Sequence, residues 1–249
     1  IANTEPNRRS LLDRYHGILP PAKVVTITNG FDRDFMNSIP PKKFDKFTLC
    51  HSGALYSLLD THFIFEAFAR WLETIKSTGP NMPPAQFVFI GTNEAGLRPI
   101  IDKYGIQDHV HFISRVSHET AISYTKAADL LLVNIGLKEN EKASGWIPLK
   151  IYDYLGCRKP ILGILPDRGA AAEIIRSNQS GYVVSEPDHR SVADILSKHY
   201  RLYMNNNLQT PLLNHNPELD QYEVVHLTRK LADVLEEACF QHKSNGFIG

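Results

Sequence analysis

Short apolar segments alternate with longer helical segments along most of this chain, and this alternation limits its fold more than any other feature. Several short segments are rich in β-branched and aromatic residues and nearly continuously apolar, which is typical of strands buried on both faces of a parallel sheet. The expected strands are Lys23–Thr28, Phe47–Ser52, Phe87–Gly91, Val110–Ser114, Asp129–Asn134, Pro160–Ile164 and Gly181–Val184.

The segments between these strands have helical periodicity. After Asp60, a candidate N-cap, apolar residues recur at helical spacing as far as Ile75. Further helices are expected at Leu97–Tyr104, which stops at Gly105, and at His118–Lys126 and Gly169–Arg176. Alternating strands and helices imply right-handed crossovers. The sequence therefore predicts an α/β protein with a Rossmann-like, doubly wound parallel sheet.

The two ends of the chain do not share this alternation. Residues 1–20 predict a helix over Asn7–Tyr15 and a Pro-Pro loop, and residues 21–205 form the α/β domain. Residues 206–249 predict a loop and an amphipathic helix that packs back on the domain. The apolar side of that helix carries Val225, Leu227, Leu231, Val234 and Leu235.

Composition excludes several partners. Lys plus Arg and Asp plus Glu each number 27, so no net charge attracts nucleic acid or an anionic membrane, and an anionic ligand must be held by local groups. Cys50, Cys157 and Cys239 are not at metal spacing and fit a reduced, cytoplasmic compartment. No metal is expected, and His51 and His111 are interpreted as strand or loop residues rather than ligands.

No apolar run approaches the roughly 20 residues that a membrane span requires, and no signal peptide is visible. The chain starts at Ile1 without a methionine, which we interpret as a cut within a longer protein. Membrane association, at the inner membrane face, is therefore expected only through the full-length protein.

The segment Gly145–Ile161 is the most informative for function. Pro148 suits the first turn of a helix and Gly156 its end. Free backbone N–H groups near Leu149 and the charge of Lys150 could hold an anion. Asp153, three residues further on, could accept hydrogen bonds from a vicinal diol such as a ribose. The alternative is a short amphipathic helix with a solvated lysine and aspartate.

This segment resembles the Pro-x-Lys-x-(Tyr/Phe)-Glu-Tyr-(Leu/Met) … (Lys/Arg)-Pro-(Ile/Val) run of the family 4 retaining glycosyltransferases, which have the two-domain GT-B fold. The matching residues are Pro148, Lys150, Tyr152, Asp153, Tyr154, Leu155, Lys159, Pro160 and Ile161. Val24–Phe35, Leu49–Tyr56 and His111–Val133 resemble the family in the same order. The resemblance covers roughly residues 1–200 and implies the C-terminal, donor-binding domain.

The resemblance implies a role for each loop that follows a strand. The turn at Ser52, Gly53 and Ala54 would approach the pyrophosphate of a nucleoside diphosphate sugar; the alternative is a tight turn without a ligand. Arg115 and Val116 would flank the base, unless Arg115 is only a solvated loop charge. Gly91 would end its strand near the base, or it is a plain strand-to-loop glycine.

The helix that begins at Pro148 and Leu149 would hold the diphosphate together with Lys150, while Asp153 would bind the ribose hydroxyls. Lys150 and Asp153 are thus the implied catalytic-site residues, and no metal cofactor is implied. The chain departs from the family at Gly145, where the first Glu of a Glu-x7-Glu pair is expected.

A second departure follows the first predicted strand, where many family members carry an Arg and a Lys. This chain has Ala54, Leu55, Tyr56 and Ser57 there. Glu141 and Lys142, in the loop before the predicted helix, are hypothetical substitutes. The acceptor domain, which precedes the donor domain in the family, is missing apart from its last helix.

By this resemblance, the intact enzyme transfers a sugar with retention from a UDP- or GDP-sugar to a glycan, lipid-linked or polysaccharide acceptor. The fragment alone is expected to be inactive. Two alternatives remain: a non-catalytic or regulatory domain of the same fold, and a sugar-nucleotide epimerase. A dinucleotide-dependent oxidoreductase is disfavoured because no Gly-x-Gly-x-x-Gly follows any predicted strand.

Overall fold

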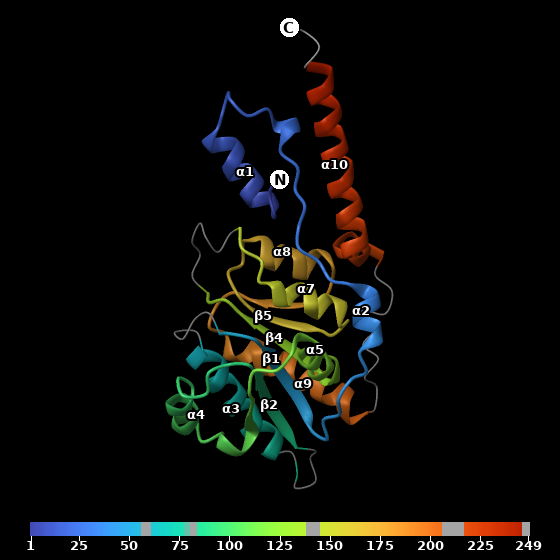
Figure 1. Ribbon diagram of the computed structural model, residues 1–249. Coiled ribbons are helices and arrows are strands. Elements are labelled where there is room, and N and C mark those ends of the chain that lie inside the picture. The colour runs from blue at the N-terminus through green and yellow to red at the C-terminus, as the bar shows by residue number, and fades with distance from the viewer. Residues whose placement is uncertain (56–60, 78, 80–83, 138–144, 206–216, 246–249) are drawn as a thin grey trace.

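The computed structural model describes residues 1–55, 61–77, 79, 84–137, 145–205 and 217–245 (Figure 1). At its centre lies one six-stranded sheet with the order β3-β2-β1-β4-β5-β6, in which every pair of neighbours is parallel. The strands are β1 Phe47–Ser52, β2 Ala85–Ile90, β3 Val110–Ile113, β4 Leu130–Asn134, β5 Ile161–Ile164 and β6 Gly181–Val184. The α/β, doubly wound parallel sheet predicted from the sequence is confirmed.

The prediction of a first strand at Lys23–Thr28 is wrong. Pro21–Lys23 forms a 3-10 helix (η1), and the residues after it make only an isolated bridge, Ala2 with Thr26. The amide of Ala2 donates to the Val25 carbonyl, and the amide of Ile27 donates to the Ala2 carbonyl, both at 2.9 Å. A β-branched run thus pairs with the chain's own N-terminus, because strand propensity depends on which neighbour is available.

Helices cover both faces of the sheet. One face packs against α3 (Thr61–Ser77), α4 (Arg98–Tyr104) and α9 (His189–Met204), and the other against α2 (Arg33–Ser38), α5 (His118–Ala127), α7 (Leu149–Gly156) and α8 (Ala170–Ser177). A short 3-10 helix, η2 (Gln107–His109), precedes β3. The two apolar layers explain why the strands are apolar at nearly every position.

Strand β1 supplies side chains to both layers. Phe47 and Leu49 belong to the layer beneath α3 and α9, whereas Cys50 belongs to the opposite layer, as the two-residue period of a strand requires. Trp71 of α3 is fully buried against Phe47, with ring centroids 5.6 Å apart, and its indole N–H donates to Ser197 of α9 at 3.0 Å. The α3–α9 pair therefore closes one side of the core.

Helix α9 was not predicted from the sequence, although its signals are present. The carboxylate of Asp188 accepts hydrogen bonds from the amides of Arg190 and Ser191 at the helix start. Val192, Leu196 and Tyr200 recur every four residues and are buried. A cap followed by this spacing is enough to predict the helix.

The terminal helices lie together at one end of the molecule (Figure 1). Helix α1 (Glu5–Arg14) begins two residues before the helix expected there. A 3-10 helix, η3 (Pro217–Tyr222), leads into α10 (Val224–Asn245), which extends away from the sheet. Val225, Leu235 and Phe240 of α10 are 64%, 55% and 74% exposed. Within the described residues, no helix is both long and apolar enough to span a membrane.

Candidate functional site

The strand order reverses between β1 and β4, which are neighbours in the sheet although β2 and β3 lie between them in sequence. In an open α/β sheet, ligands bind outside the carboxyl ends of the strands at such a switch point. Here that place is formed by the turn after β1, the end of β4 and the start of α7. The residues predicted to bind the donor come from this edge of the sheet.

The turn after β1 is tied to its neighbours by backbone hydrogen bonds. Gly53 has a φ of +87°, which a residue with a side chain adopts only with strain. Its amide donates to the Ile90 carbonyl at 2.7 Å, and its carbonyl accepts from the Thr92 hydroxyl at 2.7 Å. The Ser52 amide donates to the hydroxyl of Tyr154, on α7, at 2.9 Å. The turn is therefore held between the end of β2 and α7.

Among the described lysines and arginines, only Lys150 is strongly buried, and its ammonium lies at this turn. Its side chain leaves α7, is 8% exposed, and donates to the Ala54 carbonyl at 2.8 Å. A Cβ atom at Gly53 would lie 3.6 Å from the Lys150 Nζ, so the ammonium lies directly against the glycine. Burial lowers the pKa of Lys150 to about 7. A diphosphate beside it would favour the charged form.

His51 completes the surroundings of Lys150. The imidazole is fully buried at the end of β1, with Nδ1 2.9 Å from the Leu132 carbonyl of β4 and Nε2 2.9 Å from the Lys150 Nζ. Nε2 also lies 3.2 Å from the Ala54 carbonyl. We assign the proton to Nδ1 because the Leu132 carbonyl is the nearer one and because the ammonium, which only donates, requires an acceptor at Nε2. Burial, followed by the charge of Lys150, lowers the pKa of His51 to about 3. The interpretation of His51 as a strand residue was right, but its contact with Lys150 was missed.

Asp153 lies one turn further along α7 and faces another element. Its carboxylate oxygens are each 3.2 Å from Nε2 of His118, the first residue of α5. Burial raises the pKa of Asp153, while the adjacent His118 opposes that shift. The His118 ring in turn stacks on Phe35, with centroids 5.7 Å apart. Lys150 and Asp153 therefore contact different neighbours, at the β1 turn and at the start of α5.

The ends of β2 and β3 also lie together. Gly91 has a φ of +70°, and its amide donates to the Ile113 carbonyl at 2.8 Å. A Cβ atom at Gly91 would lie 3.9 Å from the Cα of Arg115. Arg115 is exposed, and Val116 is half-buried against the layer that contains α7. Gly91 and the Arg115–Val116 loop thus form one continuous surface beside the turn after β1.

The start of α7 fits the expectation from the sequence. Pro148 is the N-cap and is buried, and Leu149 is 65% exposed in the first turn. First-turn amides of a helix lack acceptors within the helix and favour an anion. The Gly145 carbonyl accepts from the hydroxyl of Thr4 at 2.9 Å, which ties the preceding loop to the start of α1. Glu141, Lys142, Tyr56 and Ser57 lie outside the described residues.

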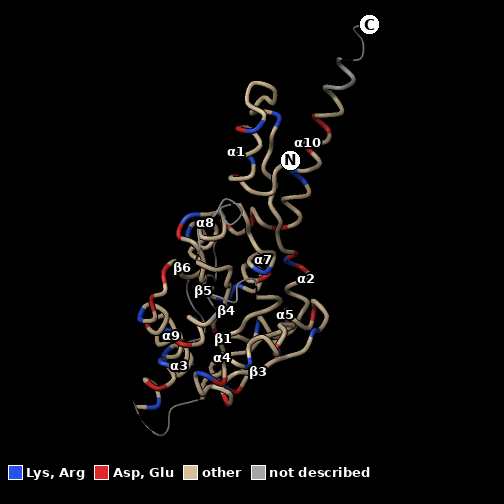
Figure 2. The backbone as a smooth tube through the Cα atoms, turned by 90° about the vertical axis from the view of Figure 1, so that its left-hand side faces the viewer, with Lys and Arg blue, Asp and Glu red and all other residues tan. Residues whose placement is uncertain are grey.

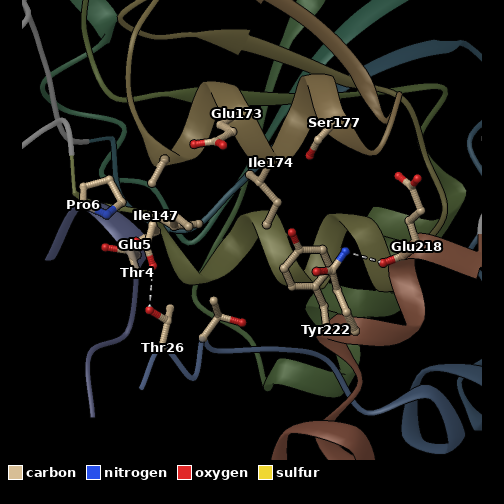
Figure 3. Close-up of a pocket in the computed structure, with 13 residues that line it drawn as sticks. Thr4, Glu5, Pro6, Thr26, Ile147, Glu173, Ile174, Ser177, Glu218 and Tyr222 are labelled. Carbon is tan, nitrogen blue, oxygen red and sulfur yellow. Dashed lines mark hydrogen bonds between the residues drawn. The ribbon is translucent and has the colours of Figure 1, made fainter. Parts of the chain in front are cut away.

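A cavity lined by described residues lies elsewhere. It has a volume of about 500 Å³ and opens between α1, the segment before Thr28, α8 and η3 (Figure 3). Glu5, Glu173 and Glu218 line it together with hydroxyl groups and the ring of Tyr222, and no described lysine or arginine does. Carboxylates repel a diphosphate, so this cavity is not the expected donor site.

Figure 2 shows basic and acidic residues interspersed along α3, α8 and α9. In the described part of the chain, no group of three or more His, Cys, Asp or Glu residues could hold a metal ion. Local groups, above all Lys150, are therefore the candidates for binding an anionic ligand.

Comparison with known proteins identifies the class that this fold and site define. The sequence matches the profile of the family described as glycosyl transferases group 1 over residues 32–208, and the chain belongs to that family. A search of curated protein sequences finds no significant match.

Solved structures agree on the fold. The chain superposes on a glycosyltransferase from Rickettsia africae with a TM-score of 0.70 and 14% identity, covering 95% of this chain and 62% of that one. It superposes on WaaG, a glycosyltransferase involved in lipopolysaccharide biosynthesis, with a TM-score of 0.65 and 18% identity, covering 94% and 61%. The chain also superposes on the C-terminal domain of a group 1 glycosyltransferase (LpcC) from Francisella tularensis, with a TM-score of 0.54 and 18% identity. This match covers 78% of this chain and 100% of that domain.

These matches define the fold and how much of the related structures the chain covers. The fold is that of the C-terminal domain of GT-B glycosyltransferases, as expected from the sequence. The chain spans about 62% of the length of the Rickettsia glycosyltransferase.

Proposed function

We propose that this chain binds the nucleoside diphosphate sugar donor of a retaining glycosyltransferase. The observation that carries the proposal is the position of Lys150: a buried ammonium against the glycine of the β1 turn, at the switch point of the sheet. The exposed start of α7 lies beside it. Together they provide a local positive site in a chain without net charge.

In the proposed complex the diphosphate lies between the Ser52–Ala54 turn and the first turn of α7. The ribose lies against Asp153, and the base lies near Gly91, Arg115 and Val116. During transfer, negative charge grows on the leaving diphosphate, and fixed N–H groups with the Lys150 ammonium stabilise it electrostatically. No residue in this arrangement calls for a metal, and we propose donor binding without one.

Transfer itself would require an acceptor domain that precedes this one, so we propose that the 249-residue chain binds donor without turning it over. The match to WaaG, a protein involved in lipopolysaccharide biosynthesis, favours a glycan or polysaccharide acceptor. Donor sugars are cytoplasmic metabolites, and the three unpaired cysteines of this chain suit a reducing compartment.

A binding domain without transfer activity is the second candidate. Gly145 occupies the place where the family commonly has a glutamate, and a Cβ atom there would clash with the Asn7 side-chain oxygen. A side chain at this position would have to displace Asn7. Turnover of donor by the full-length protein distinguishes the transferase from the binding domain.

The direct test is calorimetric titration of the chain with UDP, GDP and ADP, each beside its nucleoside. Selective micromolar binding of one diphosphate is expected. Lys150→Ala should weaken diphosphate binding by about tenfold or more and leave nucleoside binding nearly unchanged, because a charge-assisted contact contributes about 1.5–3 kcal/mol. Lys198→Ala, on the exposed side of α9, is the matched control. Equal losses for diphosphate and nucleoside would contradict the phosphate role of Lys150.

A further inference from the structure

We propose that His51 is a positioning residue for the diphosphate-binding lysine: its neutral imidazole holds the Lys150 ammonium over the Ser52–Ala54 turn. This inference rests on the donor site proposed above and adds a residue to it. His51 and Lys150 are 99 positions apart in the sequence and meet only because β1 ends beside α7.

The imidazole is fixed from both sides. It is fully buried, and the Leu132 carbonyl of β4 accepts its Nδ1 proton at 2.9 Å. The ring of Phe89 lies beside it, with centroids 6.0 Å apart. Nε2 lies 2.9 Å from the Lys150 Nζ and 3.2 Å from the Ala54 carbonyl, which itself accepts from the ammonium at 2.8 Å. Because the ammonium only donates, and because the Leu132 carbonyl is the nearer of the two carbonyls, we place the ring proton on Nδ1 and the lone pair on Nε2.

The charge state of the ring supports the same arrangement. Burial keeps the pKa of His51 at about 3, so the ring is a neutral acceptor near pH 7. Among the described residues, the other titratable side chains around this pair are Cys50 on β1 and Tyr154 on α7, and burial raises the pKa of both. They are therefore neutral near pH 7 as well, and the imidazole is the nearest described side-chain acceptor for the ammonium.

A lysine side chain is long and flexible, and fixing it on a ligand costs conformational entropy. The two acceptors at the end of β1, the imidazole and the Ala54 carbonyl, hold the ammonium against Gly53. Part of that ordering is therefore complete before a diphosphate arrives. Loss of the imidazole acceptor should weaken diphosphate binding and leave nucleoside binding unchanged.

Two substitutions of similar size separate positioning from simple packing. In His51→Asn, the amide occupies the place of Nδ1, can still donate to Leu132, and cannot reach Lys150. In His51→Gln, the longer amide places an oxygen near the position of Nε2, where it can accept from Lys150. His109 is a matched control, because its Nδ1 also contacts a carbonyl, that of Ala85, at 2.9 Å, but at the opposite ends of the strands.

The measurement is calorimetric titration of each variant of the full chain with UDP, GDP and ADP and with the corresponding nucleosides. We expect His51→Asn to lower affinity for the bound diphosphate about tenfold, with nucleoside affinity unchanged, and His51→Gln to restore most of it. His109→Asn and His109→Gln should both resemble the wild type. Equal losses in the two His51 variants, or equal losses for diphosphate and nucleoside, would overturn the proposal.

A second measurement needs no variant. Nitrogen-15 NMR of the wild-type imidazole at pH 7 should show His51 protonated at Nδ1 and unprotonated at Nε2, with the Nε2 resonance shifting when the diphosphate is added. A proton on Nε2 would rule out the bond from Lys150 and overturn the proposal, even if both variants failed to fold. If the wild type binds none of the three diphosphates, the proposed donor site fails, and the NMR result still decides whether the His51–Lys150 pair exists.

Discussion

Acid should destabilise this protein partly through His199 of α9, one of its buried histidines. The imidazole is 3% exposed and lies 3.2 Å from the Tyr182 hydroxyl. Burial, with a smaller effect of the neighbouring Lys198, lowers its pKa from 6.5 to about 4. Below pH 6.5 the unfolded chain therefore binds a proton at this residue that the folded chain does not bind. Stability from His199 is complete above pH 6.5 and is lost as the pH falls towards 4.

The expected size of the effect follows from the pH interval. One pH unit corresponds to about 1.4 kcal/mol for one proton, so a fall from pH 7.5 to pH 5 should cost about 2 kcal/mol through His199. The value depends little on the folded pKa, provided that it lies below pH 5. His199→Phe keeps a ring against Tyr182 but cannot take up a proton.

The assay is urea unfolding followed by circular dichroism at pH 7.5 and pH 5. The loss of unfolding free energy between the two pH values should be about 2 kcal/mol smaller in His199→Phe than in the wild type. Comparing losses cancels other groups, such as Asp129, whose pKa burial raises to about 6 and which acts in the opposite direction. His62→Gln, at an exposed position of α3, is the control. An unchanged loss in His199→Phe would refute the reasoning.

Three further predictions follow from the same structure. Gly156→Ala should lower the free energy of unfolding by about 1–2 kcal/mol, because the new Cβ would lie 2.9–3.1 Å from the buried Phe31 side chain. The control is Gly96→Ala, whose new Cβ would have no atom within 4 Å. It should leave the free energy of unfolding unchanged in the same urea titration. Asp153→Asn should weaken nucleoside and diphosphate binding alike by about tenfold in calorimetry. The control variant Glu173→Gln, on α8, should bind both as the wild type does. Unchanged affinity in Asp153→Asn would mean that Asp153 is only a partner of His118. Excess EDTA should leave diphosphate affinity unchanged, and a loss restored by Mg²⁺ would contradict metal-free binding.

Much of the site could be placed from the sequence, because loops after buried strands meet at one edge of a parallel sheet. The resemblance to the family pointed to the Ser52–Ala54 turn and to Gly91, and local signals pointed to the helix start at Pro148. The structure locates them at the expected ends of strands and helix. Whether they bind donor remains a prediction. The surroundings of Lys150 and Asp153 could not be read in this way, since each faces a residue from a distant part of the chain.

The sequence by itself determined the fold class, the six strands of the sheet and the family, because hydrophobic periodicity and motif order are local properties of the chain. Tertiary structure alone decided that Lys23–Thr28 pairs with Ala2 rather than joining the sheet. It also decided that His51 meets Lys150. The physical reason is the same in both cases: strand order selects which distant segments become neighbours, and hydrogen bonds to those neighbours then fix the pairing of the backbone and the protonation of the site.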